Sequence, residues 1–287
     1  MDRINLYILI ISLFGVVSCT DDAVELEEDR FVVEAFLFAN EPVSGIRVKG
    51  IIPLNDPDSV APLITEARVL LMKDGNNYEL SVNEDDEYEY TGNDLTVSTG
   101  DIFDIEVTYG DITATASTVV PAPTTGLQIS ESEILLPEIV LPTPGGGGGF
   151  GGGGATAVRE AIMSILSNSL IVEWDNPNQE LYFMVVENLV DELDPIFPDR
   201  IANRLRRFRF VSEPTNENFM EFSLANLETF GQHVIKVYHV NQEYADLYEN
   251  LNQDSRDLNE PPSNIKNGLG VFSAFNSQNV YFDVKKE

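Results

Sequence analysis

The chain has a single cysteine, Cys19, and few basic side chains among its 287 residues. One cysteine cannot form an intrachain disulfide, so the stability of the protein must come from packed cores. Only 17 Lys and Arg stand against 48 Asp and Glu, which gives a net charge of -31. This charge makes binding to nucleic acid or to an anionic bilayer surface electrostatically unfavourable. The lack of a second cysteine excludes a disulfide-stapled fold, and the scarcity of basic residues excludes a nucleic-acid-binding protein.

No hydrophobic run is long enough to span a bilayer. The most apolar stretch, Ile4 to Val17, falls short of the roughly 20 residues of a membrane helix and fits the apolar region of a secretory signal. It leads into Leu13-Phe14-Gly15-Val16-Val17-Ser18-Cys19, in which a small residue and then Cys follow branched apolar residues, the pattern that lipoprotein signal peptidase accepts. We predict a signal peptide at residues 1–18 and lipidation of Cys19, whose acyl chains supply about 0.8 kcal/mol per buried methylene. The alternative is a plain secreted protein with an unpaired cysteine.

Residues 19–29 are polar and acidic, with Asp21 and Asp22 close behind the cysteine. A segment of this composition has little to bury and predicts a flexible tether. Acidic residues directly behind an acylated Cys resemble the export signal that sends Bacteroidota lipoproteins to the outer face of the outer membrane. We therefore expect a lipid-anchored, surface-exposed protein of the cell outer membrane.

The mature chain predicts a mainly β fold with two β-sandwich-like domains of the Ig or fibronectin kind. Short alternating runs separated by turn residues predict antiparallel strands in a first domain, residues 30–122. The runs are Phe31 to Phe38, Gly45 to Ile52, Ala67 to Lys73, Tyr78 to Val82, Tyr88 to Thr91, Phe103 to Tyr109 and Ile112 to Val119. Asp74 to Asn77 and Gly110-Asp111 predict hairpin turns, because Gly and Asn accept positive φ readily. Pro121 and Pro123 predict the end of this domain.

The second domain is predicted at residues 123–287, with a disordered glycine-rich loop at 144–155. Its expected strands are Gly126 to Ser130, Ser169 to Trp174, Tyr182 to Asn188, Leu205 to Val211, His233 to Val240, Val271 to Phe275 and Val280 to Val284. Tyr244, Leu247, Tyr248 and Leu251 recur at helical spacing and predict a short helix from about Gln242 to Asn252. This helix is expected to cap a sheet.

Residues suited to catalysis or metal binding form no recognisable signature. His233 and His239 lie on one face of a predicted strand, without the further ligands of a zinc site. The glycine run lacks the Lys-Ser or Lys-Thr pair of a phosphate loop. Asn55 to Asp58 and Glu84 to Glu87 gather oxygen ligands that Ca²⁺ prefers, outside EF-hand spacing, and solvated turns explain them as well. We expect no catalytic residues, no metal and no cofactor.

Five arginines concentrate within ten residues of this acidic chain: Arg200, Arg204, Arg206, Arg207 and Arg209. On a strand, Arg207 and Arg209 point away from Phe208 and Phe210 and predict a positive ridge for carboxylate contacts. Arg204, Arg206, Arg207 and Arg209 are therefore candidate partner contacts, and internal pairing with the chain's own acids is the alternative. Phe150, alone in the glycine run, is a further candidate anchor for a partner, and an untethered insertion is the alternative.

Several segments together resemble one family. They are the lipobox, Phe31 to Leu37, Ile112 to Pro121, and the run Pro262-Ser263-Asn264-Ile265-Lys266-Asn267-Gly268-Leu269-Gly270-Val271-Phe272. The chain resembles the Bacteroidota lipoprotein family known as domain of unknown function 4249, with the glycine-rich insertion as a departure. The resemblance implies an accessory lipoprotein beside a TonB-dependent outer-membrane receptor.

The function expected from these features is a non-enzymatic accessory or ligand-binding module that works with such a receptor in nutrient uptake. Two other hypotheses stay open. One is a hydrolase that uses carboxylates or calcium on a β scaffold, and the other is a structural adhesin of the envelope.

Overall fold

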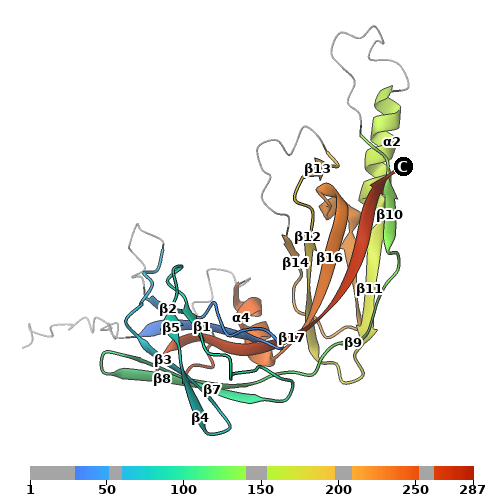
Figure 1. Ribbon diagram of the computed structural model, residues 1–287. Helices are drawn as coiled ribbons and strands as arrows, with labels where there is room; N and C mark the ends of the chain where they lie inside the picture. The colour runs from blue at the N-terminus through green and yellow to red at the C-terminus, as the bar shows by residue number, and fades with distance from the viewer. Residues whose placement is uncertain (1–29, 52–59, 140–153, 198–208, 252–261) are drawn as a thin grey trace, which may run out of the picture.

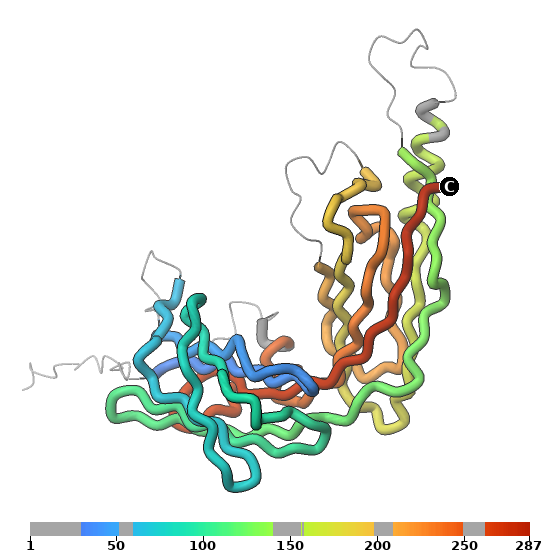
Figure 2. Tube along the Cα trace, in the orientation of Figure 1, coloured from blue at the N-terminus to red at the C-terminus, as the bar shows by residue number. Residues whose placement is uncertain are grey.

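The computed structural model describes residues 30–51, 60–139, 154–197, 209–251 and 262–287. These residues form a mainly β protein with two sandwich-like lobes that meet at an angle (Figures 1 and 2). One lobe holds the first strands of the chain and the other holds most of the second half. The predicted fold class is confirmed.

Two helices, one 3-10 turn and seventeen strands lie in the described residues. The strands of the first half are β1 (Phe31–Phe38), β2 (Arg47–Gly50), β3 (Arg68–Lys73), β4 (Asn76–Glu79), β5 (Ser81–Val82), β6 (Tyr88–Glu89), β7 (Ile102–Tyr109) and β8 (Ile112–Val119). There follow β9 (Thr125–Ile129), β10 (Glu133–Leu136), α2 (Gly154–Ser167), β11 (Ser169–Asp175), β12 (Leu181–Asn188), β13 (Asp194–Pro195), β14 (Arg209–Val211), β15 (Phe219–Ser223), η1 (Leu224–Asn226), β16 (Thr229–Val240), α4 (Gln242–Leu251) and β17 (Leu269–Lys286).

The first lobe packs the sheet β4-β3-β7-β8 against β2, β1 and the first half of β17. Strand β1 alternates strictly, so that Phe31, Val33, Ala35 and Leu37 enter the core between the two sheets. Strands β3, β7 and β8 supply the facing apolar side chains. The period-2 pattern of the sequence thus places one face of each strand in the core.

The second lobe packs the sheet β15-β11-β9 against β12, β16 and the second half of β17. Leu170, Val172 and Trp174 of β11 point into its core, where they meet Phe222 and Phe282. Helix α2 adds the fully buried Ile165 to the same core. None of the helices in the described ranges is long and apolar enough to cross a membrane.

Strand β17 belongs to both lobes. Its residues Leu269 to Phe275 pair in parallel with β1, and Phe275 to Val284 pair antiparallel with β16. The sequence predicted two separate closing strands here, and this was wrong because the polar residues from Asn276 to Asn279 do not break the ladder. They stay paired with β16 between the two apolar runs. Figure 1 shows the strand continuing from one lobe into the other.

A third apolar cluster fills the junction between the lobes. Phe183, Tyr238 and Phe275 contact Phe36 and Tyr244 there, on the face of β12 and β16 opposite the second core. Tyr244 comes from α4 and meets the ring of Phe275 edge-on at 4.9 Å between centroids. The predicted helix is therefore confirmed, and it covers the junction between the lobes.

The C-terminal signature run binds the end of the chain to the first lobe. The side chain of Asn264 donates to the carbonyl of Phe272 at 2.7 Å and accepts from its N–H at 2.9 Å, as a neighbouring strand would. Lys266 exchanges two backbone hydrogen bonds with Thr115 of β8. Gly270 has a φ of +105°, and a Cβ there would lie 2.1 Å from the carbonyl oxygen of Val33. The run from Pro262 to Phe272 therefore has a structural role, which is to hold the start of β17 in the first lobe.

The boundary near residue 122 stays a prediction, and the contacts of β17 cross it. Ile265, Phe272 and Ala274, from the predicted second domain, are buried in the core of the first lobe. The sequence also missed β10, β15 and α2. The predicted disordered loop 144–155 was wrong at its end, because Gly154 and Ala155 begin α2, and the rest of that loop lies outside the described residues. For α2 a signal existed, since Val158, Ala161, Ile162 and Ile165 recur at helical spacing and pack against the second core.

Replacing Gly270 by alanine tests the close contact with β1. We expect Gly270→Ala to lower the free energy of unfolding by roughly 3 kcal/mol, because a strained φ is combined with a backbone overlap. Chemical denaturation measures the change. Gly100→Ala is the matched control, since Gly100 also has positive φ (+82°) but meets nothing within 4 Å, and it should cost about 1 kcal/mol. Equal losses for both variants would contradict the proposed role of Gly270.

Candidate functional site

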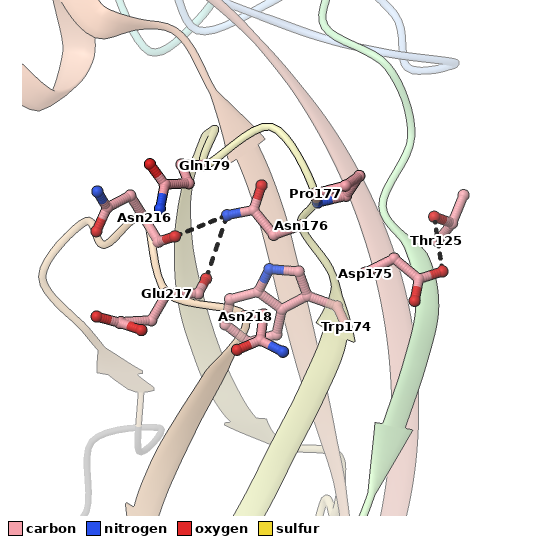
Figure 3. A pocket seen from close by; sticks show the side chains of 9 residues that line it. All are labelled: Thr125, Trp174, Asp175, Asn176, Pro177, Gln179, Asn216, Glu217 and Asn218. Atoms are coloured by element: carbon pink, nitrogen blue, oxygen red, sulfur yellow. Dashed lines mark hydrogen bonds between the residues drawn. The ribbon is translucent and has the colours of Figure 1, made fainter.

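A polar cleft opens in the second lobe, close to the junction. It has a volume of 560 Å³ and is formed by the start of β9, the β11–β12 turn and the loop before β15 (Figure 3). The lining residues are Thr125, Trp174, Asp175, Asn176, Pro177, Gln179, Asn216, Glu217 and Asn218. Amide and carboxylate side chains dominate this surface, and one indole ring lies among them.

Asn176 holds the two main loops of the cleft together. Its Nδ2 donates to the carbonyl oxygens of Glu180 and Asn216, both at 2.9 Å, and to that of Glu217 at 3.3 Å. Its Oδ1 accepts from the N–H of Glu180 at 2.9 Å. Thr215 adds a reciprocal pair of backbone bonds to Tyr182. These internal bonds fix the two loops, which form the rim of the cleft, before any ligand binds.

Asp175 is held at the opposite side of the cleft. Thr125 Oγ1 donates to its carboxylate at 3.2 Å. Gly126 lies so close that a Cβ there would be 2.5 Å from a carboxylate oxygen of Asp175. The glycine also has a φ of +67°. Asp175 is thus oriented by its neighbours, while its remaining lone pairs stay available for a ligand.

An aromatic stack lies below the cleft. The Trp174 ring packs on Tyr182 at 5.4 Å between centroids, and Tyr182 stacks on His239 at 4.8 Å. Burial, followed by the charges of Glu180 and Asp175, raises the pKa of Tyr182 to about 12, so the phenol is neutral at ordinary pH. His239 bonds the carbonyl of Ala122 through Nδ1 at 2.8 Å. This stack forms a rigid floor.

Most residues singled out from the sequence as sites lie outside the described residues. These are Cys19, Phe150, Arg204, Arg206 and Arg207. Arg209 is described, and its Nε lies 3.1 Å from Glu187 Oε1. Lys236 approaches the other oxygen of the same carboxylate at 3.0 Å. Arg209 therefore makes the internal pairing that the sequence left open, and its role as a partner contact stays a prediction.

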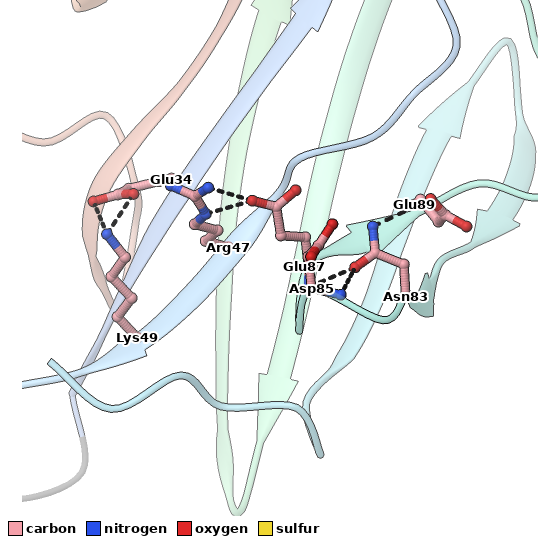
Figure 4. A network of polar contacts seen from close by, with 7 residues as sticks. All are labelled: Glu34, Arg47, Lys49, Asn83, Asp85, Glu87 and Glu89. Carbon is pink, nitrogen blue, oxygen red and sulfur yellow. Dashed lines mark hydrogen bonds and ion pairs between the residues drawn. The ribbon is translucent and has the colours of Figure 1, made fainter. Parts of the chain in front are cut away.

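The acidic run from Glu84 to Glu87 forms the turn between β5 and β6. Asn83 Oδ1 accepts from the backbone N–H groups of Asp85 at 2.9 Å and Glu87 at 3.0 Å, and the Glu87 carboxylate pairs with Arg47 (Figure 4). Within the described ranges no group of three or more His, Cys, Asp or Glu is placed to hold a metal ion. The second acidic run, Asn55 to Asp58, lies outside these ranges.

His233 and His239 are both buried in aromatic contacts. His233 stacks on Phe282 at 5.0 Å, and its Nδ1 lies 3.0 Å from the carbonyl of Gly231. Its Nε2 is buried without a hydrogen-bond partner in the described residues. Burial lowers the pKa of His233, which favours the neutral imidazole. Ordinary packing accounts for both histidines.

Sequence reasoning missed the cleft. Its residues come from turns rich in Asn, Pro and Thr, such as Asn176-Pro177 and Pro214-Thr215-Asn216, which read as solvated loops. The one available signal was Trp174, the single tryptophan of the chain, directly followed by Asp and Asn. Only the fold brings these turns together with Thr125.

Fold and cleft define a mainly β protein with two sandwich-like lobes and a preformed polar site. Residues 19–279 match the family described as domain of unknown function (DUF4249), and the chain belongs to that family. No curated protein matches the sequence.

Two solved structures give weak similarities. Domains A168 to A170 of titin are 12% identical, with a TM-score of 0.20, over 88% of this chain and 62% of the titin chain. A Ca²⁺-stabilized adhesin that helps an Antarctic bacterium bind ice is 13% identical, with a TM-score of 0.19, over 90% of this chain and 49% of the adhesin chain. This chain thus spans less than two thirds of either structure. Both TM-scores are too low to support a statement about this protein.

The role of Asn176 in the rim predicts a local loss of order when its amide is removed. We expect Asn176→Ala to lower the free energy of unfolding by on the order of 2 kcal/mol, because four hydrogen bonds are lost. Hydrogen exchange at the Glu180 N–H should also become faster. Asn216→Ala is the control, since no described residue bonds its side chain, and it should change neither quantity. Unaltered exchange in Asn176→Ala would argue against a rim held by this residue.

The buried His233 predicts a pH dependence of stability. Its folded pKa is lowered from an unfolded value of 6.5. This contribution to stability is therefore complete above about pH 6.5 and is lost as the pH falls below it. His233→Phe keeps the ring contact with Phe282 and should show a smaller loss of unfolding free energy between about pH 7.5 and 5.5. Parallel pH profiles for variant and parent, measured by denaturant titration, would disprove this assignment.

Proposed function

We propose that this protein is a lipid-anchored outer-membrane protein that acts as a non-enzymatic ligand-binding or accessory module of a TonB-dependent receptor in nutrient uptake. The observation that carries the binding function is the polar cleft. Its rim is fixed by Asn176, while the side chains of Gln179, Asn216 and Asn218 have no hydrogen bond within the described residues. A preformed set of free donors and acceptors is typical of a binding site.

The position of the cleft fits an anchored protein. The predicted tether leads into Phe31 at the start of β1, and the last residue of β1, Phe38, pairs with Phe275 at the junction. The β11–β12 turn of the cleft leads into Leu181, which pairs with Val240, the partner of Phe275. Strand β1 therefore puts about 25 Å between Phe31 and the junction. This arrangement would hold the cleft away from the bilayer.

The chemistry beneath the cleft supports binding rather than catalysis. Tyr182 is neutral at ordinary pH, and His239 is held by the carbonyl of Ala122 within an aromatic stack. The carboxylate of Asp175 is oriented by Thr125. These groups form a fixed surface that presents hydrogen-bonding atoms to a ligand.

Membership of the family supports the partnership with a receptor, and the lipobox supports the lipid anchor. Purification of the C-terminally tagged protein from its own membranes should recover a TonB-dependent receptor in near-stoichiometric amount. Acylated Cys19 should be the first residue of the purified protein by mass spectrometry. Repeated purification without such a receptor would overturn the partnership.

Two variants separate anchoring from folding. Cys19→Ser removes the thiol that would be acylated and at which the signal peptide is processed, so we expect this variant to be missing from the outer membrane and to lose its receptor. Ser18→Ala keeps a small residue before the cysteine and should behave as the parent does. Recovery of the receptor without binding of any ligand in the cleft would support the accessory role and reject the ligand-binding role.

A further inference from the structure

The indole of Trp174 lines the cleft, and its buried N–H is an unpaired donor at the base. Trp174 is only 3% exposed, and its Nε1 is buried without a hydrogen-bond partner in the described residues. In Figure 3 the ring nitrogen points to the side of the cleft that Asn176 borders. Because an indole N–H can only donate, it requires an acceptor atom. Because Nε1 itself has no accessible surface, an oxygen of a ligand at the base of the cleft can supply it after a small shift of the residues over the ring.

The free side chains of the rim match hydroxyl groups. Gln179, Asn216 and Asn218 are exposed and line the cleft. Each side-chain amide offers two donor hydrogens and an acceptor oxygen, and a hydroxyl likewise donates and accepts. Asp175 adds an acceptor for further hydroxyls. A ligand that carries several adjacent hydroxyls can therefore bond to several of these groups at once.

The charge of the cleft excludes an anionic ligand and disfavours a metal ion. No Lys or Arg is among the nine lining residues, and the whole chain carries a net charge of -31. The two carboxylates of the lining, Asp175 and Glu217, lie on opposite sides of the cleft (Figure 3). They do not converge on one point, as the oxygen ligands of a calcium ion must. The side-chain amides then favour a neutral ligand rich in hydroxyl groups over an organic cation, which would need carboxylates that converge on its charge.

We propose that this cleft binds a neutral carbohydrate. The side-chain amides of Gln179, Asn216 and Asn218 hold its hydroxyls, and the Trp174 N–H donates to one of its oxygens. The volume of 560 Å³ lies within the range of about 300–1,000 Å³ found for small-molecule sites. This inference rests on the proposed binding function, and it is independent of the receptor.

Tryptophan fluorescence tests the inference directly, because Trp174 is the only tryptophan of the chain. The full-length protein is purified in a detergent without a sugar headgroup and titrated with maltohexaose, cellohexaose, xylohexaose and mannohexaose. We expect at least one of these neutral oligosaccharides to produce a saturable change in emission. The affinity should be insensitive to added NaCl, because no ion pair is formed.

The double variant Asn216→Ala/Asn218→Ala removes two of the free amides without touching the bonds of Asn176. It should raise the dissociation constant at least about tenfold, with an unchanged melting temperature. Asn93→Ala, an exposed asparagine of the first lobe, is the matched control and should bind as the parent does. The inference is overturned by binding that the double variant leaves intact, or by the lack of a saturable response to all four oligosaccharides.

Charged probes distinguish the other ligand classes. A saturable response to CaCl₂ or to spermidine, with none to the oligosaccharides, would identify the cleft as a cation site and reject the carbohydrate. Co-purification of the receptor without an oligosaccharide response overturns this inference and leaves the partnership standing. An oligosaccharide response without recovery of a receptor supports this inference and overturns the partnership.

Discussion

The structure depends on one strand that is shared by two cores. Strand β17 gives Phe272 and Ala274 to the first core and Phe282 and Val284 to the second. Its parallel pairing with β1 joins the two ends of the folded chain. Neither core is complete without β17, so neither lobe can finish folding until this strand has joined it. Pairing over such a sequence separation is slow, because the entropy of closing the loop is lost before the contacts form.

Sharing a strand makes the junction a packed element rather than a linker. Phe275 is the partner of Phe38 in β1 and of Val240 in β16, so the two pairings meet at one residue. The next residue, Asn276, is buried and donates to Thr99 and to the carbonyl of Pro121. The rings around Phe275 exclude water from this point. The β11–β12 turn of the cleft leads into Leu181, the partner of Val240, so the cleft has a fixed position relative to the first lobe.

The sequence predicted the strands that have one buried face. In β1, β7 and β11 each inward side chain is apolar, and in β8 only the buried Thr118 is not, so alternation alone located these strands to within a residue. It failed for β17, because Asn276 owes its place in the strand to partners more than 150 positions away. Local pattern carries no information about such partners. The apolar residues of α2 recur at helical spacing, but the helix was not predicted because it directly follows the glycine-rich run.

The candidate site was beyond sequence reasoning for a related reason. Its side chains are common turn residues, and asparagine in a turn usually bonds its own loop. Asn176 does so for Glu180, yet it also bonds Asn216 and Glu217 in a second loop. The sequence does not separate the asparagine that builds the rim from Asn216 and Asn218, whose side chains stay free. That distinction follows from tertiary contacts alone.

The acidity of the whole chain is compatible with a neutral ligand. A surface with a net charge of -31 repels anions over a Debye length, about 8 Å at physiological salt, and attracts cations without selecting among them. Selectivity must then come from short-range, directional groups. The free side-chain amides on loops held by Asn176, one oriented carboxylate and a buried indole N–H are such groups, and their hydrogen bonds act only on a ligand that fits. A chain of this charge can therefore be specific for a neutral molecule, which its long-range field neither draws in nor excludes.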